Sequence, residues 1–242
     1  MDFNSFIAQY FTSDSRNATH RSLAGMRGNY CIPDDKLDEL YEIIINCPYP
    51  THLLEVPTPE SSNIKIDIDL RFPNDVIGRK YKPENIISIV ELYNQAICKF
   101  LKINESQLKA FVFERDAPYK DKGNLKDGIH IMYPDIICNT KYQFEIRNYV
   151  IEHSPPIFTQ IGAKNAIEDI IDKRIIATNG WMLYGCSKQN LKPYKLTYVI
   201  DSELNQLNIS HYMSNLFNLT KLLSIRKTVN DINAELADEY NF

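Results

Sequence analysis

The most constraining feature of this chain is residues 64–70, where apolar and charged side chains alternate with the period of a β-strand. The isoleucines and the leucine share one face of the expected strand, and Asp67 and Asp69 share the other. Two carboxylates on one strand face repel each other, and a divalent cation is the usual way in which a protein offsets that repulsion. The run therefore predicts a strand that is buried on one side and binds metal on the other.

A second run, residues 126–131, also alternates, and it places Lys126, Gly128 and His130 on one face. A cation, a gap and an imidazole in that order suit a polyphosphate. Together with the aspartate strand, this face indicates a metal-dependent enzyme that handles nucleotides.

Charge is distributed unevenly along the 242 residues. The net charge of −4 argues against strong nonspecific binding of nucleic acid. Residues 173–200, however, contain no Asp or Glu while holding five Lys or Arg residues, which would complement a polyanion locally. The alternative interpretation of this window is a solvated surface with chance clustering.

The five cysteines are scattered and form no C-x-x-C pair, so we expect free thiols, a reducing cytoplasmic compartment and no zinc site. No apolar run approaches the roughly 20 residues of a membrane span, and the N-terminus shows no secretory signal. We expect no membrane partner.

Apolar periodicity and end signals predict helices over residues 2–11, 35–47, 84–101, 140–152, 165–170, 210–225 and 229–240. They predict strands over residues 52–56, 65–72, 108–114, 128–133, 181–184 and 195–200, with polar loops over residues 12–28 and 115–124. Because strands and helices are interleaved, the expected class is α+β or mixed α/β.

Two further motifs follow the first two in order. Asp172 comes directly after two isoleucines, and residues 184–194 form a basic hairpin with the patterns Y-G-C-S-K and K-P-Y. The ordered set resembles the archaeo-eukaryotic primase superfamily, and within it the primase domain of the poxvirus-type primase-helicases of large nucleocytoplasmic DNA viruses. The motifs span residues 64–195 of the chain.

This resemblance implies one archaeo-eukaryotic primase domain over residues 1–242. An RRM-like catalytic sheet, at about residues 61–205, would pack with an N-terminal α/β unit at about residues 1–60, followed by C-terminal helices at about residues 206–242. The implied function is DNA-templated primer synthesis in viral DNA replication, with or without polymerase activity, by two-metal nucleotidyl transfer. The implied partners are a single-stranded DNA template, NTP or dNTP, and a helicase in the same protein or complex at a cytoplasmic viral replication site.

The resemblance also assigns roles to residues of this sequence. Two Mg²⁺ or Mn²⁺ ions would be held by the catalytic carboxylates Asp67, Asp69 and Asp172, with Asp169 as a weaker candidate for the third. The incoming nucleotide would contact Lys126, Gly128, His130, Ser187 and Lys188. Candidate template or nucleotide contacts are Arg27, Tyr184 and Lys192, while Trp181 and Tyr184 either follow the template or pack beneath the hairpin.

The sequence departs from the family pattern at Gly128, where many members have serine, so we expect the glycine N–H to approach the phosphate instead. No G-x-x-x-x-G-K-[ST] motif is present. His20, Arg21 and Arg27 either close over the γ-phosphate or belong to a surface loop. Two alternative functions stay open: a D-x-D sugar-nucleotide transferase, and a non-catalytic module that docks a helicase or binds DNA.

Overall fold

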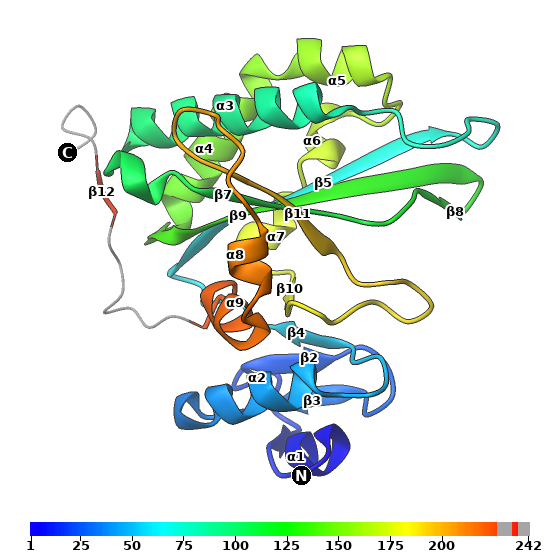
Figure 1. The fold of residues 1–242 in the computed structure, drawn as a ribbon, viewed down its shortest axis with the longest axis vertical. Helices are drawn as coiled ribbons and strands as arrows, with labels where there is room; N and C mark the ends of the chain where they lie inside the picture. Colours follow the sequence, from blue (N-terminus) through cyan, green and yellow to red (C-terminus); the bar gives the residue numbers. More distant parts are fainter. Residues whose placement is uncertain (227–233, 237–242) are drawn as a thin grey trace.

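The computed structural model describes residues 1–226 and 234–236. Figure 1 shows two antiparallel sheets, one above the other in the view, with a layer of helices covering the upper sheet. This arrangement confirms the expected α+β class. Within the described residues, no helix is long and apolar enough to cross a membrane.

The upper, central sheet has the strand order β11-β7-β9-β5, and every neighbouring pair is antiparallel. Two of its strands, β5 and β9, are longer than the sequence pattern predicts. The members are β5 (Ser61–Pro73), β7 (Ala110–Glu114), β9 (Asn124–Asn139) and β11 (Lys195–Ile200), with β8 (Tyr119–Asp121) paired to β9.

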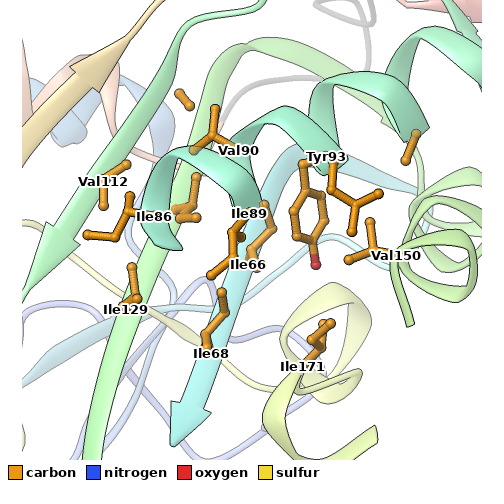
Figure 2. Packing of buried hydrophobic residues seen from close by; sticks show 14 of the residues in the cluster. Ile66, Ile68, Ile86, Ile89, Val90, Tyr93, Val112, Ile129, Val150 and Ile171 are labelled. Atoms are coloured by element: carbon orange, nitrogen blue, oxygen red, sulfur yellow. The ribbon is translucent and has the colours of Figure 1, made fainter. Parts of the chain in front are cut away.

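The covering helices lie on one face of this sheet. They are α3 (Pro83–Phe100), α4 (Thr140–His153), α5 (Pro155–Ile161) and α6 (Ile167–Ile170). The short helix α7 (Arg174–Ala177) follows α6, and its Ile175 and Ile176 pack with Phe111, Phe113 and Met132 of the opposite face. Figure 2 shows Ile66 and Ile68 of β5 packed beneath Ile86, Ile89 and other apolar residues of α3. Helix α4 ends at His153, and Pro155 begins α5, because proline needs no hydrogen-bond partner for its nitrogen in a first turn.

Along β5, apolar and polar side chains point to opposite faces of the sheet, as the sequence predicts. Ile66 and Ile68 are buried in the core, and the side chains between them lie on the opposite face. Lys65 shares that opposite face but is also buried, with its Nζ donating to Ser62 Oγ at 2.7 Å and to the carbonyl of Ile176 at 3.2 Å. Burial lowers the pKa of Lys65 to about 7.

The lower, N-terminal sheet has the order β1-β3-β2-β4-β10. Its strands are short: β1 (Phe11–Thr12), β2 (His20–Ser22), β3 (Gly28–Tyr30), β4 (Leu53–Glu55) and β10 (Trp181–Met182). Helices α1 (Phe3–Ala8) and α2 (Leu37–Ile45) pack with it, α2 following a 3₁₀ turn at Asp34–Lys36. Two expectations change here: residues 12–28 contain strand rather than only loop, and β10 joins this sheet from a segment assigned to the catalytic core.

The C-terminal part differs from the single helix expected over residues 210–225. It forms α8 (Ser210–Met213) and α9 (Leu216–Leu222), separated where the side chain of Asn215 accepts a hydrogen bond from the amide of Asn218 and begins a new helix. Of the helix expected over residues 229–240, only 234–236 are described, and Glu235–Leu236 form β12, paired with β6 (Leu101–Lys102). The remainder of that expected helix lies outside the described residues. A second 3₁₀ turn covers Glu105–Gln107.

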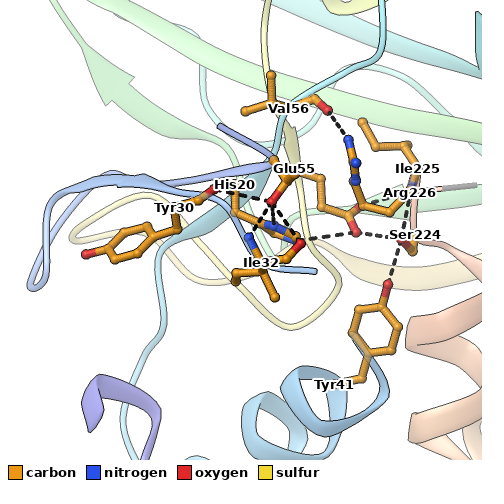
Figure 3. A network of polar contacts seen from close by, with 10 residues as sticks. His20, Tyr30, Ile32, Tyr41, Glu55, Val56, Ser224, Ile225 and Arg226 are labelled. Atoms are coloured by element: carbon orange, nitrogen blue, oxygen red, sulfur yellow. Dashed lines mark hydrogen bonds and ion pairs between the residues drawn. The ribbon is translucent and has the colours of Figure 1, made fainter. Parts of the chain in front are cut away.

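A buried polar network ties β4 to the segment after α9 (Figure 3). The Glu55 carboxylate accepts hydrogen bonds from Ser224 Oγ at 2.5 Å and from the Ile225 amide at 2.8 Å. Tyr41 Oη donates to the same serine oxygen at 2.8 Å. His20, fully buried in β2, places Nε2 4.0 Å from Glu55 Oε1, so it faces this network rather than a phosphate. Burial raises the pKa of Glu55 to about 7 and lowers that of His20 to about 3.

Candidate active site

The pairing register of β5 and β9 in the central sheet brings the two sequence motifs side by side on one face. Asp67 pairs with His130 across β5 and β9, and Asp69 pairs with Gly128. The imidazole Nε2 of His130 lies 3.4 Å from Asp67 Oδ1. These side chains occupy the face of the sheet opposite the helices, so both carboxylates are presented together with the imidazole. The sequence predicted which face of its own strand each side chain occupies. That the aspartates and the histidine lie next to each other follows from the pairing of β5 with β9.

Burial and charge act in opposite directions on the two carboxylates. Burial alone would raise the pKa of Asp67, but the neighbouring His130, Lys188 and Arg115 outweigh it and hold that pKa below its usual range. The pKa of Asp69 is raised, first by burial and then by the charge of Asp67. Ionisation is therefore favoured at Asp67 and disfavoured at Asp69. A cation bound between the two carboxylates would favour ionisation of both.

Asp172 lies beside this pair but is engaged elsewhere. Its amide donates to the carbonyl of Asp67 at 3.0 Å, which anchors the end of α6 against β5. Its Oδ1 accepts from the amide and Nε of Arg174 at 2.9 and 3.2 Å, and its Oδ2 accepts from Asn179 at 3.2 Å. Asp169, the weaker candidate, is exposed.

The donor set therefore offers two hard carboxylates, Asp67 and Asp69, on one face, which suits Mg²⁺ or Mn²⁺. Across residues 1–226 and 234–236, no group of three or more His, Cys, Asp or Glu side chains is arranged to hold a metal ion.

A cavity of about 270 Å³ opens in front of the aspartates. Asp67, Asp69 and His130 line it on one side. Its other walls carry four cationic side chains: Arg21 of β2, Arg115 after β7, and Lys188 and Lys192 of the segment between β10 and β11. Cations on several walls around a carboxylate pair make a site suited to a multiply charged anion together with a metal ion.

Two buried polar atoms at this cavity have no hydrogen-bond partner within the described residues: Ser187 Oγ and Arg21 Nε. Buried polar atoms are usually paired, so unpaired ones at a cavity wall are consistent with a role in binding. Arg21 lies in β2, while Ser187 and Lys188 belong to the turn after β10. The two sheets thus build the cavity jointly.

The remaining predicted residues lie around this cavity or outside it. Lys126 is not among the lining residues, and its Nζ lies 4.0 Å from Asp69 Oδ2 and 3.9 Å from Asp121 Oδ2. Arg27 is exposed in the β2–β3 turn and does not line the cavity. Tyr184 packs beside Phe113, with ring centroids 6.0 Å apart, as the packing interpretation expects.

Sequence reasoning missed the roles of Arg115 and Tyr194. Tyr194 stacks on His130, with ring centroids 3.7 Å apart and an interplanar angle of 20°. The Arg115 guanidinium lies 4.0 Å from the centre of the same tyrosine ring, and Trp181 lies 4.8 Å from the imidazole. Burial and the charge of Asp67 raise the pKa of Tyr194, so its phenol stays protonated at neutral pH. The K-P-Y pattern contained this tyrosine, but nothing in one sequence indicated that it reaches His130.

The Gly128 amide, expected to approach a phosphate, has a protein partner in the structure. That N–H donates to Asp127 Oδ1 at 3.0 Å, and Arg79 holds the same carboxylate, with Nε 2.9 Å from Oδ2. What glycine provides here is space, because an added Cβ would meet the Tyr194 hydroxyl at 2.6 Å and the Ile68 carbonyl oxygen at 3.1 Å.

Comparison with known proteins identifies the family of the chain. Residues 19–200 match the family described as the C962R protein N-terminal AEP domain, where AEP denotes archaeo-eukaryotic primase, and the chain belongs to this family. The chain is also similar to the putative helicase L207/L206 of Acanthamoeba polyphaga mimivirus, with 34% identity over 196 residues. That alignment covers 78% of this chain and 20% of the mimivirus protein, so the chain spans about a fifth of that relative's length. The resemblance to viral primase-helicases is confirmed, and family membership indicates a primase-type function.

Proposed function

We propose that this chain is a nucleotidyltransferase that synthesises primers on a single-stranded DNA template during viral DNA replication. The observation that carries the proposal is the cavity in which Asp67 and Asp69 face His130 and four cationic side chains. Like charges clustered on one strand face destabilise a fold unless a bound ligand of opposite charge neutralises them. A carboxylate pair opposed by cations matches a metal ion together with a nucleoside triphosphate.

In this proposal Asp67 and Asp69 hold Mg²⁺ or Mn²⁺. Asp172 joins them as the third carboxylate, which requires it to exchange its bonds to Arg174 and Asn179 for the metal. A metal ion bound there would activate the primer 3′-hydroxyl and stabilise the charge on the leaving pyrophosphate.

The protein side chains bind and orient the triphosphate. Lys188 and Arg115 neutralise phosphate charge from the wall opposite β5, and His130, held by Asp67, donates to a phosphate oxygen. Ser187, whose buried hydroxyl has no partner in the described part of the chain, supplies a further hydrogen bond. Lys192 and the rest of the acid-free segment follow the template.

Family membership supports a primase-type reaction, and the name of the mimivirus relative supports a helicase in the same protein or complex. The choice between ribo- and deoxynucleotides is part of the experiment.

The decisive experiment incubates the purified chain with single-stranded DNA, Mg²⁺ or Mn²⁺ and labelled nucleotides, without a primer. Short products from the wild type, absent with Asp67→Ala or Asp69→Ala at unchanged folding, are expected. Extension of a supplied primer without products in the unprimed reaction would replace the primase assignment with a polymerase. Inactivity in both reactions would favour a docking or DNA-binding module.

A further inference from the structure

The phosphate-facing side of β9 has a gap that another element fills. Lys126, Gly128 and His130 alternate along this face, over about 13 Å of strand between the first and the last. The middle position carries no side chain. The hydroxyl of Tyr194, from the segment just before β11, lies there instead, 2.6 Å from where a Gly128 Cβ would be.

The tyrosine ring is held on both sides. His130 stacks on it at 3.7 Å, and the Arg115 guanidinium lies 4.0 Å from the ring centre. Arg115 is itself fixed, because its Nη1 donates to the carbonyl of Lys192 at 3.0 Å. The ring also lines the cavity in front of Asp67. Its hydroxyl therefore has a set position rather than a range of rotamers.

We propose that Tyr194 is a further phosphate-binding residue of this site, whose hydroxyl completes a row of donors between Lys126 and His130. The ring orients the imidazole, and the hydroxyl donates to a phosphate oxygen of the nucleotide. This inference rests on the proposed function, since it assumes that the cavity accepts a triphosphate.

The two contributions can be separated by substitution. Tyr194→Phe keeps the stack on His130 and removes only the hydroxyl. Gly128→Ser adds a hydroxyl to the strand itself, but its Cβ would meet the tyrosine oxygen at 2.6 Å. In the double variant that clash is relieved, because the nearest ring atom, Cζ, would be 3.8 Å away and only the Ile68 carbonyl at 3.1 Å would have to adjust.

The test measures the affinity of the full chain for Mg²⁺–ATP and Mg²⁺–tripolyphosphate by isothermal titration calorimetry. Loss of one hydrogen bond to a charged phosphate should weaken both ligands about 10-fold in Tyr194→Phe. Gly128→Ser alone should also weaken binding, and the double variant should return to within about 3-fold of the wild type. Tyr198→Phe, which removes a hydroxyl from β11 outside the cavity lining, is the matched control and should leave affinity unchanged.

A second readout concerns the ring alone. The ring-current shift that Tyr194 imposes on the His130 carbon-bound protons in NMR spectra should persist in Tyr194→Phe and be lost in Tyr194→Leu, which leaves only the contribution of Trp181. Steady-state kinetics should show a raised nucleotide KM with little change in kcat for Tyr194→Phe.

Wild-type affinity in Tyr194→Phe overturns the inference, and so does a double variant that binds no better than the single ones. A wild-type chain that binds neither ligand overturns the inference and the triphosphate site together. A wild-type chain that binds ATP, with the expected losses in the variants, but makes no primer overturns the proposed function and leaves Tyr194 a phosphate ligand.

Discussion

Removing the charge of Asp69, one of the two clustered aspartates, should stabilise the protein while abolishing the primer synthesis proposed for it. Asp67 and Asp69, two residues apart on β5, are separated by about 7 Å along the strand. At an effective dielectric constant of about 20, their repulsion is about 2 kcal/mol. The Asp69 side chain is 32% exposed and lies 4.0 Å from Lys126, so we expect a net gain of about 1 kcal/mol when its charge is removed.

The sign agrees with the raised pKa of Asp69, caused first by burial and then by Asp67. A carboxyl whose folded pKa exceeds its unfolded pKa destabilises the fold when it ionises, so at neutral pH an uncharged amide side chain is preferred at this position. Asp69→Asn should therefore raise Tm by about 2–4 °C in EDTA, measured by calorimetry, and abolish primer synthesis.

Two controls sharpen this experiment. Asp172→Asn, the same substitution at the neighbouring carboxylate, should lower Tm because it weakens the hydrogen bonds from Arg174. Mg²⁺ in about tenfold excess over its dissociation constant should stabilise the wild type by about 1.4 kcal/mol and the Asp69→Asn variant far less. An Asp69→Asn protein that melts at or below the wild-type temperature in EDTA, or that gains as much from Mg²⁺, would refute the reasoning.

Three further outcomes are expected. Lys188→Ala should mainly raise the nucleotide KM in steady-state assays, whereas an unchanged KM would mean that Lys188 is only surface charge. Burial raises the pKa of Glu55 from 4.5 to about 7, so the folded state holds this proton more tightly. The stability difference between wild type and Glu55→Gln, measured by urea unfolding, should fall by up to about 3 kcal/mol as pH rises across that window, and a flat difference would contradict the shift. Arg79→Ala leaves the buried carboxylates of Asp127 and Glu114 without their shared cation and should cost about 2–3 kcal/mol in the same measurement.

The sequence predicted the parts of the site that lie within one strand. Alternation placed Asp67 and Asp69 opposite the buried Ile66 and Ile68, because a strand reverses face at every residue. The helix predicted over residues 84–101 is α3, which begins at Pro83 because proline suits a first turn. Both features depend only on neighbouring residues, so the spacing of residues in the sequence is enough to predict them.

Contacts between distant segments were beyond that reasoning. No spacing indicates that Tyr194 stacks on His130, or that Gly128 is a glycine because a tyrosine hydroxyl lies over it. For His20 the sequence left open a phosphate contact or a surface loop, and β2 instead turns the side chain inward toward Glu55. Strands as short as β2 and β10 have too few residues to show an alternating pattern in the sequence. They are recognised as strands only from their pairing with β3 and β4.

Strand β10 belongs to both halves of the molecule. Its backbone pairs with β4 at Trp181 and Glu55, in the N-terminal sheet, while the Trp181 ring lies against His130 of the central sheet. A fragment beginning at Ser61 would strip β10 of its partner and remove the cavity wall that carries Arg21. The two sheets therefore do not form interchangeable modules. Recombination or protein engineering that exchanges the catalytic strands must carry the N-terminal sheet with them.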